Sequence, residues 1–241
     1  MYIKKTVLND NIKGWENFED NQLLRCKKHK IYEKNIMLKM PINSSFLDIG
    51  SHYGDTIITL ALHAKNNNRN DIRFYAFEPN KIKCDHIEKI SKLNKLNIKV
   101  YNKCIGNSNK KCVPDSSTLY GHATYSLNED GDIDIIKLDD LEKELSPIGF
   151  IHIDTEGWEK HVLLGANNIL LNPLNKMYII SEYWGIGNTK LTKDKGYCKG
   201  IISDNPRKEL LKLTKKYNCK VMEILRCEET NLVFTVNINK I

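Results

Sequence analysis

Residues 46–54, Phe-Leu-Asp-Ile-Gly-Ser-His-Tyr-Gly, predict a short buried strand followed by a tight loop. The strand ends near Asp48, and Gly50 allows the backbone to turn sharply or to approach a ligand closely. A helical pattern begins after the second glycine, Gly54, which lets that helix pack closely. The segment is typical of a strand–loop–helix at the ligand-binding edge of an open α/β sheet, although a plain surface turn has the same pattern.

The spacing of the two glycines restricts the kind of ligand. They follow GxxxG and not GxGxxG, the pattern that holds a dinucleotide pyrophosphate on a helix N-terminus. An acid at the end of the strand suits a ligand that carries a positive charge or hydroxyl groups. We therefore expect S-adenosylmethionine (SAM) and not NAD, and an NAD-dependent oxidoreductase is the weakest alternative.

Strand and helix patterns alternate along the rest of the chain. They predict a doubly wound, mostly parallel seven-stranded α/β sheet, with an antiparallel edge strand because the last two strands follow each other without a helix. A helical pattern over residues 15–40 predicts an N-terminal helical cap (1–45) ahead of a SAM-binding domain (46–241). Residues 106–132 predict an irregular insertion, and residues 158–171 predict one continuous helix.

Composition bounds the setting and the partners. The chain has 241 residues, and none of its apolar runs approaches the ~18 residues that span a bilayer, so we expect no membrane span. Its seven scattered cysteines form no CxxC pair, which predicts reduced thiols and a cytoplasmic protein. A net charge of +7 permits nucleic-acid binding without requiring it. A homodimer is compatible with the sequence.

Acidic residues stand where several predicted strands end. An ionised carboxylate at the end of a buried strand is costly unless it is paired or binds something. The carboxyl ends of such strands meet at one edge of the sheet, so these acids predict one shared site. The acids are Asp48, Glu78, Asp154, Glu156 and Glu182.

Each of these acids has a functional and a structural interpretation. Glu78 ends the second strand, where an acid can accept both hydroxyls of a ribose, or it can favour the N-terminus of the next helix. Asp154 is a candidate general base or a ligand for Mg²⁺ or Mn²⁺, as is Glu182, whereas Thr155 and Glu156 also suit a helix cap. His152 alternates with Asp154 on one strand and is either a helper of that acid or a satisfied core histidine.

Taken together, several segments resemble the FkbM family of SAM-dependent methyltransferases, over about residues 40–185. The matching segments occur in the family's order and are specific only in combination. They are residues 46–54, Tyr75-Ala-Phe-Glu-Pro-Asn80, Ile136-Lys-Leu-Asp-Asp-Leu141, Ile151-His-Ile-Asp-Thr-Glu-Gly-Trp-Glu159 and Leu163-Leu-Gly-Ala166. The resemblance implies the Rossmann-like class I methyltransferase fold, SAM as cofactor and O-methylation. The family usually has Lys at the position of His152.

The resemblance also implies roles for individual residues. Asp48, Gly50 and Gly54 would shape the pocket for the methionine part of SAM, and Glu78 would hold the ribose. Asp154 and Glu156 would lie near the transferred methyl group. Cys104 and Ile105 would lie beside the adenine, and the predicted cofactor-binding set further includes Ser51, Asp55 and Asn80.

The expected function is methyl transfer from SAM to a hydroxyl of a sugar or glycan, with Asp154, Glu156, His152 and Glu182 as the catalytic set. A divalent cation, Mg²⁺ or Mn²⁺, held by Asp154 and Glu182 would relieve the repulsion between the carboxylates. The alternatives are a nucleic-acid methyltransferase and a non-catalytic partner protein with the same fold. Against the first, the chain has no Asn/Asp-Pro-Pro-aromatic motif.

Overall fold

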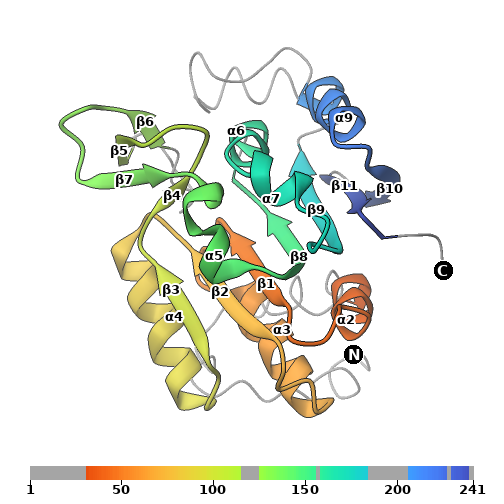
Figure 1. Cartoon of the computed structure of the whole chain (residues 1–241). Helices are drawn as coiled ribbons and strands as arrows, with labels where there is room; N and C mark the ends of the chain where they lie inside the picture. Colours follow the sequence, from red (N-terminus) through yellow and green to blue (C-terminus); the bar gives the residue numbers. More distant parts are fainter. Residues whose placement is uncertain (1–30, 115–124, 156–157, 184–205, 227–228, 239–241) are drawn as a thin grey trace.

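The computed structural model describes residues 31–114, 125–155, 158–183, 206–226 and 229–238 (Figure 1). Its main sheet has seven strands in the order β10-β11-β9-β8-β1-β2-β3. Every neighbouring pair is parallel except those of β11, which runs antiparallel to β9 and to β10. The predicted mostly parallel sheet with antiparallel pairing at one edge is confirmed, with β11 second from that edge. The strands are β1 (Ser45–Ile49), β2 (Arg73–Phe77), β3 (Ile98–Tyr101), β8 (Ile148–Ile153), β9 (Met177–Tyr183), β10 (Lys220–Arg226) and β11 (Glu229–Val236).

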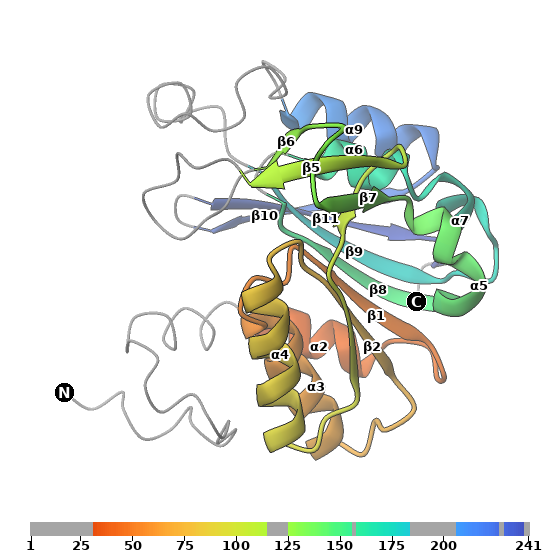
Figure 2. The same ribbon diagram turned by 90° about the vertical axis from the view of Figure 1, so that its left-hand side faces the viewer.

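Helices cover both faces of this sheet. Figure 2 shows α2, α3 and α4 on one face and α5, α6, α7 and α9 on the other. The described helices are α2 (Ile31–Leu38), α3 (Asp55–Asn66), α4 (Lys81–Leu93), the 3-10 helix η1 (Leu138–Leu141), α5 (Glu142–Leu145), α6 (Glu159–Leu164), α7 (Asn167–Leu171) and α9 (Pro206–Lys216).

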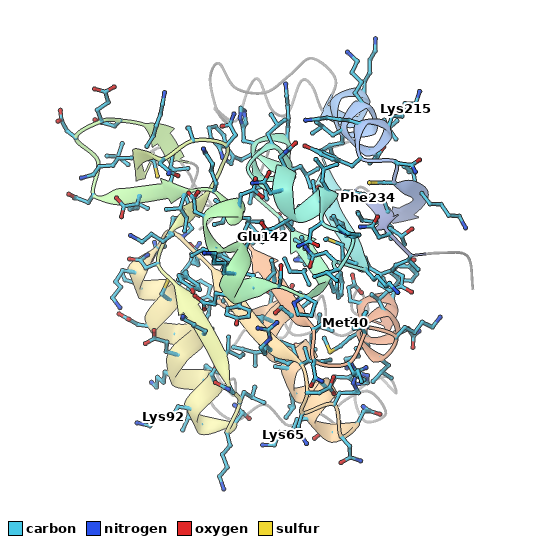
Figure 3. All side chains as sticks on the ribbon, viewed as in Figure 1. Met40, Lys65, Lys92, Glu142, Lys215 and Phe234 are labelled. Atoms are coloured by element: carbon cyan, nitrogen blue, oxygen red, sulfur yellow. The ribbon has the colours of Figure 1, made fainter. Side chains whose placement is uncertain are left out.

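Alternation along the strands divides the apolar residues between two cores. In β1, Phe46 packs into the core under α2, α3 and α4, whereas Leu47 belongs to the core on the opposite face. Met40 and Phe234, both labelled in Figure 3, belong to the first and the second of these cores respectively. Because β1 is buried on both faces, its residues read as a nearly continuous apolar run.

The register of the central strands brings three chain segments to the same edge. Ile49 at the end of β1 is paired with Phe77 at the end of β2 and with Ile153 at the end of β8. The residues that follow these strand ends therefore meet at the carboxyl edge of the sheet. This edge is where the acids in the sequence predict a site.

Two of the four strands of a second sheet lie within residues 106–132, the insertion predicted to be irregular. Four short strands pair in the order β4-β7-β5-β6, and Figure 1 shows this small sheet next to α6. The prediction of an irregular segment is wrong for its described part, because polar residues form strands here by pairing with residues far along the chain. These strands are β4 (Cys104–Ile105), β5 (Lys110–Pro114), β6 (Tyr125–Leu127) and β7 (Ile133–Ile136).

The helix predicted over residues 158–171 is divided into α6 and α7 at Gly165. A Cβ at Gly165 would overlap the carbonyl oxygen of Gly106, so this position needs glycine. Asp139 then starts α7 afresh, because its carboxylate accepts hydrogen bonds of 3.0–3.1 Å from the backbone N–H groups of Asn168 and Ile169.

The first described helix is α2, at Ile31–Leu38. There α2 contributes Ile36 and Met37 to the core that also contains Phe46. The rest of the predicted helical cap lies outside the described residues, and the division at residue 45 stays a prediction. Of the helices in the described ranges, none is long and apolar enough to cross a membrane.

Candidate functional site

The loop between β1 and α3, residues 50–54, is fixed by backbone hydrogen bonds. Gly50 and Ser51 both donate their N–H groups to the carbonyl of Phe77 at the end of β2, over 2.9 and 3.1 Å. The Ser51 hydroxyl donates to the carbonyl of Asp48 over 2.7 Å, and Gly54 N–H donates to the carbonyl of Ser51. Gly50 and Gly54 have φ angles of 82° and 85°, a region that favours glycine. The loop is therefore a preformed, tightly turned segment.

Glu78 joins this loop to the start of α4. Its side chain is buried, and its two carboxylate oxygens accept 2.9 Å hydrogen bonds from the backbone N–H groups of His52 and Asn80. Burial raises the pKa of Glu78, while the Lys83 ammonium and the two N–H donors oppose that rise. Each carboxylate oxygen can accept a second hydrogen bond, so the carboxylate is able to receive two further hydroxyls.

Asn80 has the capping role that was the alternative for Glu78. Its side-chain oxygen accepts hydrogen bonds from the N–H groups of Ile82 and Lys83, so Asn80 caps α4. Glu78 is thereby left to bond across to the β1–α3 loop. Asn102, which sequence reasoning missed, donates to the carbonyls of Glu78 and Pro79 over 3.1 and 2.7 Å. The signal for it is its position just after β3, at the same edge of the sheet.

Asp48 and His152 form a buried pair below the loop. Their side chains are on the neighbouring strands β1 and β8, and Nδ1 of His152 lies 2.8 Å from Oδ1 of Asp48. Asp48 is 0% exposed and His152 is 5% exposed. Oδ2 of Asp48 has no hydrogen-bond partner among the residues that the structure describes. The structure thus brings His152 to the acid of the glycine loop, whereas the sequence grouped it with Asp154.

Asp154 lies directly against the glycine loop. Its N–H donates to the carbonyl of Ile49 over 2.9 Å, and a Cβ at Gly50 would overlap the carbonyl oxygen of Asp154. Gly50 is therefore required for the close approach of two chain segments, in addition to its φ angle. Asp154 is a half-buried residue. The two segments that the sequence assigned to the two halves of one site are in contact.

Replacing Gly50 with alanine is expected to lower the free energy of unfolding by about 2–4 kcal/mol, combining left-handed backbone strain with overlap. Gly54→Ala is the matched control, because the φ angle of Gly54 is equally positive. A Cβ at Gly54 would lie 2.7 and 2.9 Å from the side chains of Ile58 and Ile87, and not against backbone atoms. Urea unfolding compares the two variants. A Gly50→Ala protein as stable as the wild type would contradict the close approach.

The other predicted residues are placed less directly. Asp55 begins α3, and Ile105 is buried in the core of the α6 face. The Cys104 thiol lies 3.2 Å from that of Cys112 in the small sheet. Glu182 is in β9 opposite Asn231, and nothing further is described of its side chain; Glu156 lies outside the described residues.

The predicted metal site has only one ligand that the structure describes. Asp154 is the described member, and no three His, Cys, Asp or Glu side chains come together as metal ligands among the described residues. A cation held by Asp154 and Glu182 stays a prediction.

The residues present fit SAM. The glycine loop leaves its backbone close to the edge of the sheet, and Glu78 offers a fixed, buried carboxylate with room for two hydroxyl donors. Asp48, buried at the end of β1 just before the loop, would supply a carboxylate on the side of a cationic methyl donor. A seven-stranded sheet of this order with an antiparallel strand second from one edge, and with these acids at its carboxyl ends, defines a class I methyltransferase fold.

Comparison with protein families gives the particular family. The model of the methyltransferase FkbM domain matches residues 48–183, more than half of the chain. The chain therefore belongs to the FkbM family of SAM-dependent methyltransferases. Comparison with curated proteins finds no match.

Comparison with solved structures finds similar chains at low sequence identity. The FkbM methyltransferase of Methylobacillus flagellatus KT is 16% identical, with a TM-score of 0.49 over 80% of this chain; the chain spans 44% of that protein's length. A SAM-dependent methyltransferase from Aquifex aeolicus is 12% identical, with a TM-score of 0.49 and coverages of 90% and 97%. Magnesium protoporphyrin IX methyltransferase from Synechocystis PCC 6803, solved with bound SAH, is 10% identical, with a TM-score of 0.50 and coverages of 90% and 83%.

Proposed function

We propose that this chain transfers the methyl group of SAM to a hydroxyl of a sugar or glycan. The observation that carries the proposal is the contact between the Gly50 loop and Asp154. The contact joins the backbone of Asp154, a half-buried residue, to the segment that would hold the methyl donor, which supports a role for Asp154 in this site. The Synechocystis enzyme, which was solved with bound SAH, the product that SAM leaves after methyl transfer, supports SAM as the donor.

Glu78 would hold the donor by its ribose. A carboxylate with two fixed N–H partners cannot turn away, and its remaining acceptor positions match two neighbouring hydroxyls. The Asp48–His152 pair would support the glycine loop from the strands β1 and β8, with its charge on the side of the methionine part of the donor. His152 is then a supporting residue of the donor site.

Methyl transfer from a sulfonium is an in-line displacement, so its catalysis is mainly proximity and orientation of an acceptor oxygen about 3 Å from the methyl carbon. A sugar hydroxyl is a weak nucleophile at neutral pH, and a base that removes its proton helps the reaction. Asp154 is the residue we propose for that role. Glu156 and Glu182 stay proposed helpers, and a homodimer and a cytoplasmic location stay predictions.

Radiolabelled SAM and a panel of free sugars and glycans test the acceptor class. We expect label to pass from SAM to at least one hydroxyl-bearing sugar, and not to RNA or DNA. Transfer to nucleic acid alone, falling steeply with salt, would replace the proposal with a nucleic-acid methyltransferase.

Adding EDTA to the same assay tests the metal. If Asp154 acts as the base without a cation, transfer continues at the same rate in EDTA. Loss of transfer that Mg²⁺ or Mn²⁺ restores would instead assign a cation to Asp154 and Glu182.

A further inference from the structure

Glu159, the first residue of α6, is a buried acid for which the proposed reaction has no role so far. The residue is 4% exposed. One of its oxygens, Oε1, lies 3.1 Å from both the backbone nitrogen and the hydroxyl of Thr155, and it accepts both hydrogen bonds. Burying a carboxylate is costly, and these two donors to one oxygen offset part of that cost.

Thr155 is the residue that directly follows Asp154. Asp154 is already fixed on its other side, where its N–H donates to Ile49 and its carbonyl packs on Gly50. Thr155 is also held through its own carbonyl, which accepts a 3.3 Å hydrogen bond from Trp158 N–H. The backbone that carries the Asp154 carboxylate is thus held from the β1 side and from the α6 side.

We propose that Glu159 is a positioning residue, which holds Thr155 so that the Asp154 carboxylate faces the acceptor hydroxyl. This inference rests on the proposed function, because it assigns Glu159 to the orientation of the base. In this role Glu159 acts through Thr155 and not by binding the donor or the acceptor. A displacement of about 1 Å at a reacting group can cost about 100-fold in rate, so such a clamp is able to control turnover.

The geometry predicts different results for two substitutions of Glu159. Glu159→Ala removes the acceptor, and we expect kcat to fall about 10- to 100-fold while the Kd for SAM stays within about twofold. Glu159→Gln keeps a carbonyl oxygen where Oε1 accepts both bonds, so it should restore kcat to within about threefold of the wild type. Glu142→Ala is the matched control. Glu142 also accepts a side-chain hydrogen bond, of 2.8 Å from Asn172, but it comes before the start of β8, whereas Asp154 follows the end of that strand.

Single-turnover assays with labelled SAM and the best sugar of the panel, with calorimetry for SAM, measure these effects. A helix cap with no catalytic consequence would lower the Tm of Glu159→Ala and leave kcat unchanged well below that temperature, which would overturn the proposal. Equal losses in Glu159→Ala and Glu159→Gln would also overturn it, because Glu159 would then act through its charge.

Two further readouts keep the test decisive. If Glu159→Ala does not fold, Thr155→Val removes only the hydroxyl donor; a loss of about 3- to 10-fold in kcat supports the clamp, and a wild-type kcat overturns it.

If the wild type methylates no acceptor, the proposed function fails and hydrogen exchange of the Thr155 amide decides the clamp. Exchange should be faster in Glu159→Ala and unchanged in Glu159→Gln; equal exchange in all three proteins would overturn it.

Discussion

Replacing Glu78 with alanine is expected to weaken SAM binding by about 100-fold, with little change in the unfolding cooperativity of the chain. The carboxylate would accept two hydrogen bonds from the ribose hydroxyls, each contributing about 1.5–3 kcal/mol because the acceptor is charged. The lower end of their sum, about 3 kcal/mol, corresponds to slightly more than about 100-fold in Kd. Glu78 also accepts the N–H groups of His52 and Asn80, so its loss loosens the loop that would hold the donor. Calorimetric titration with SAM measures the effect.

Glu78→Gln is the companion variant, because it keeps one acceptor oxygen while removing the charge. We expect it to bind SAM about 10-fold more weakly than the wild type. Glu144→Gln is the control, since Glu144 lies in α5, before β8 begins, and accepts hydrogen bonds from Lys99 and Tyr101 of β3. SAM binding by Glu78→Ala within threefold of the wild type would show that Glu78 does not hold the ribose.

Replacing Asp154 with asparagine is expected to lower the rate of methyl transfer about 10²- to 10⁴-fold, the usual contribution of a positioned general base. Asparagine is nearly isosteric with aspartate, and the backbone contacts of Asp154 to Ile49 and Gly50 do not involve its side chain. The Kd for SAM should therefore stay within about twofold. Initial rates at saturating SAM, together with calorimetry, separate the two quantities.

The outcome for Asp154→Asn separates catalysis from donor binding. A large loss of rate with unchanged SAM affinity supports the base role. Full activity with intact SAM binding would remove Asp154 from the mechanism. A comparable loss of both quantities would place Asp154 in the donor site.

Much of the edge of the sheet was predictable from the sequence. Local patterns give the strand ends at Ile49, Phe77 and Ile153, and parallel strands bring their carboxyl ends together. The sequence therefore predicted that Asp48, Glu78 and Asp154 would share one edge. It also proposed both roles for the Glu78 segment, and the structure divides them, with Asn80 as the cap.

The partners within the site required knowledge of the strand order. Period-two alternation put His152 and Asp154 on one face of the predicted strand, but only the pairing of β8 with β1 shows that His152 meets Asp48. Likewise, glycine at position 50 suggested an approach to a ligand, whereas the structure adds an approach to Asp154. Both facts depend on contacts between residues about 100 positions apart.

Long-range contacts also explain the errors in the predicted elements. The periodicity of residues 158–171 is helical throughout, and nothing local shows that Gly165 packs on Gly106 and that Asp139 begins a new helix. The strands β5 and β6 are missed for the same reason, because they are short and depend on the pairing of β5 with β6 and with β7.

The central claim is that SAM binds with its ribose on Glu78, and a double-mutant cycle between protein and ligand tests it most directly. Calorimetry would compare SAM with an analogue lacking the ribose 2′- and 3′-hydroxyls, on the wild type and on Glu78→Gln. We predict that the analogue binds about 10- to 100-fold more weakly than SAM to the wild type, and that this ratio falls to about threefold or less in the variant. The same ratio in both proteins would contradict the claim.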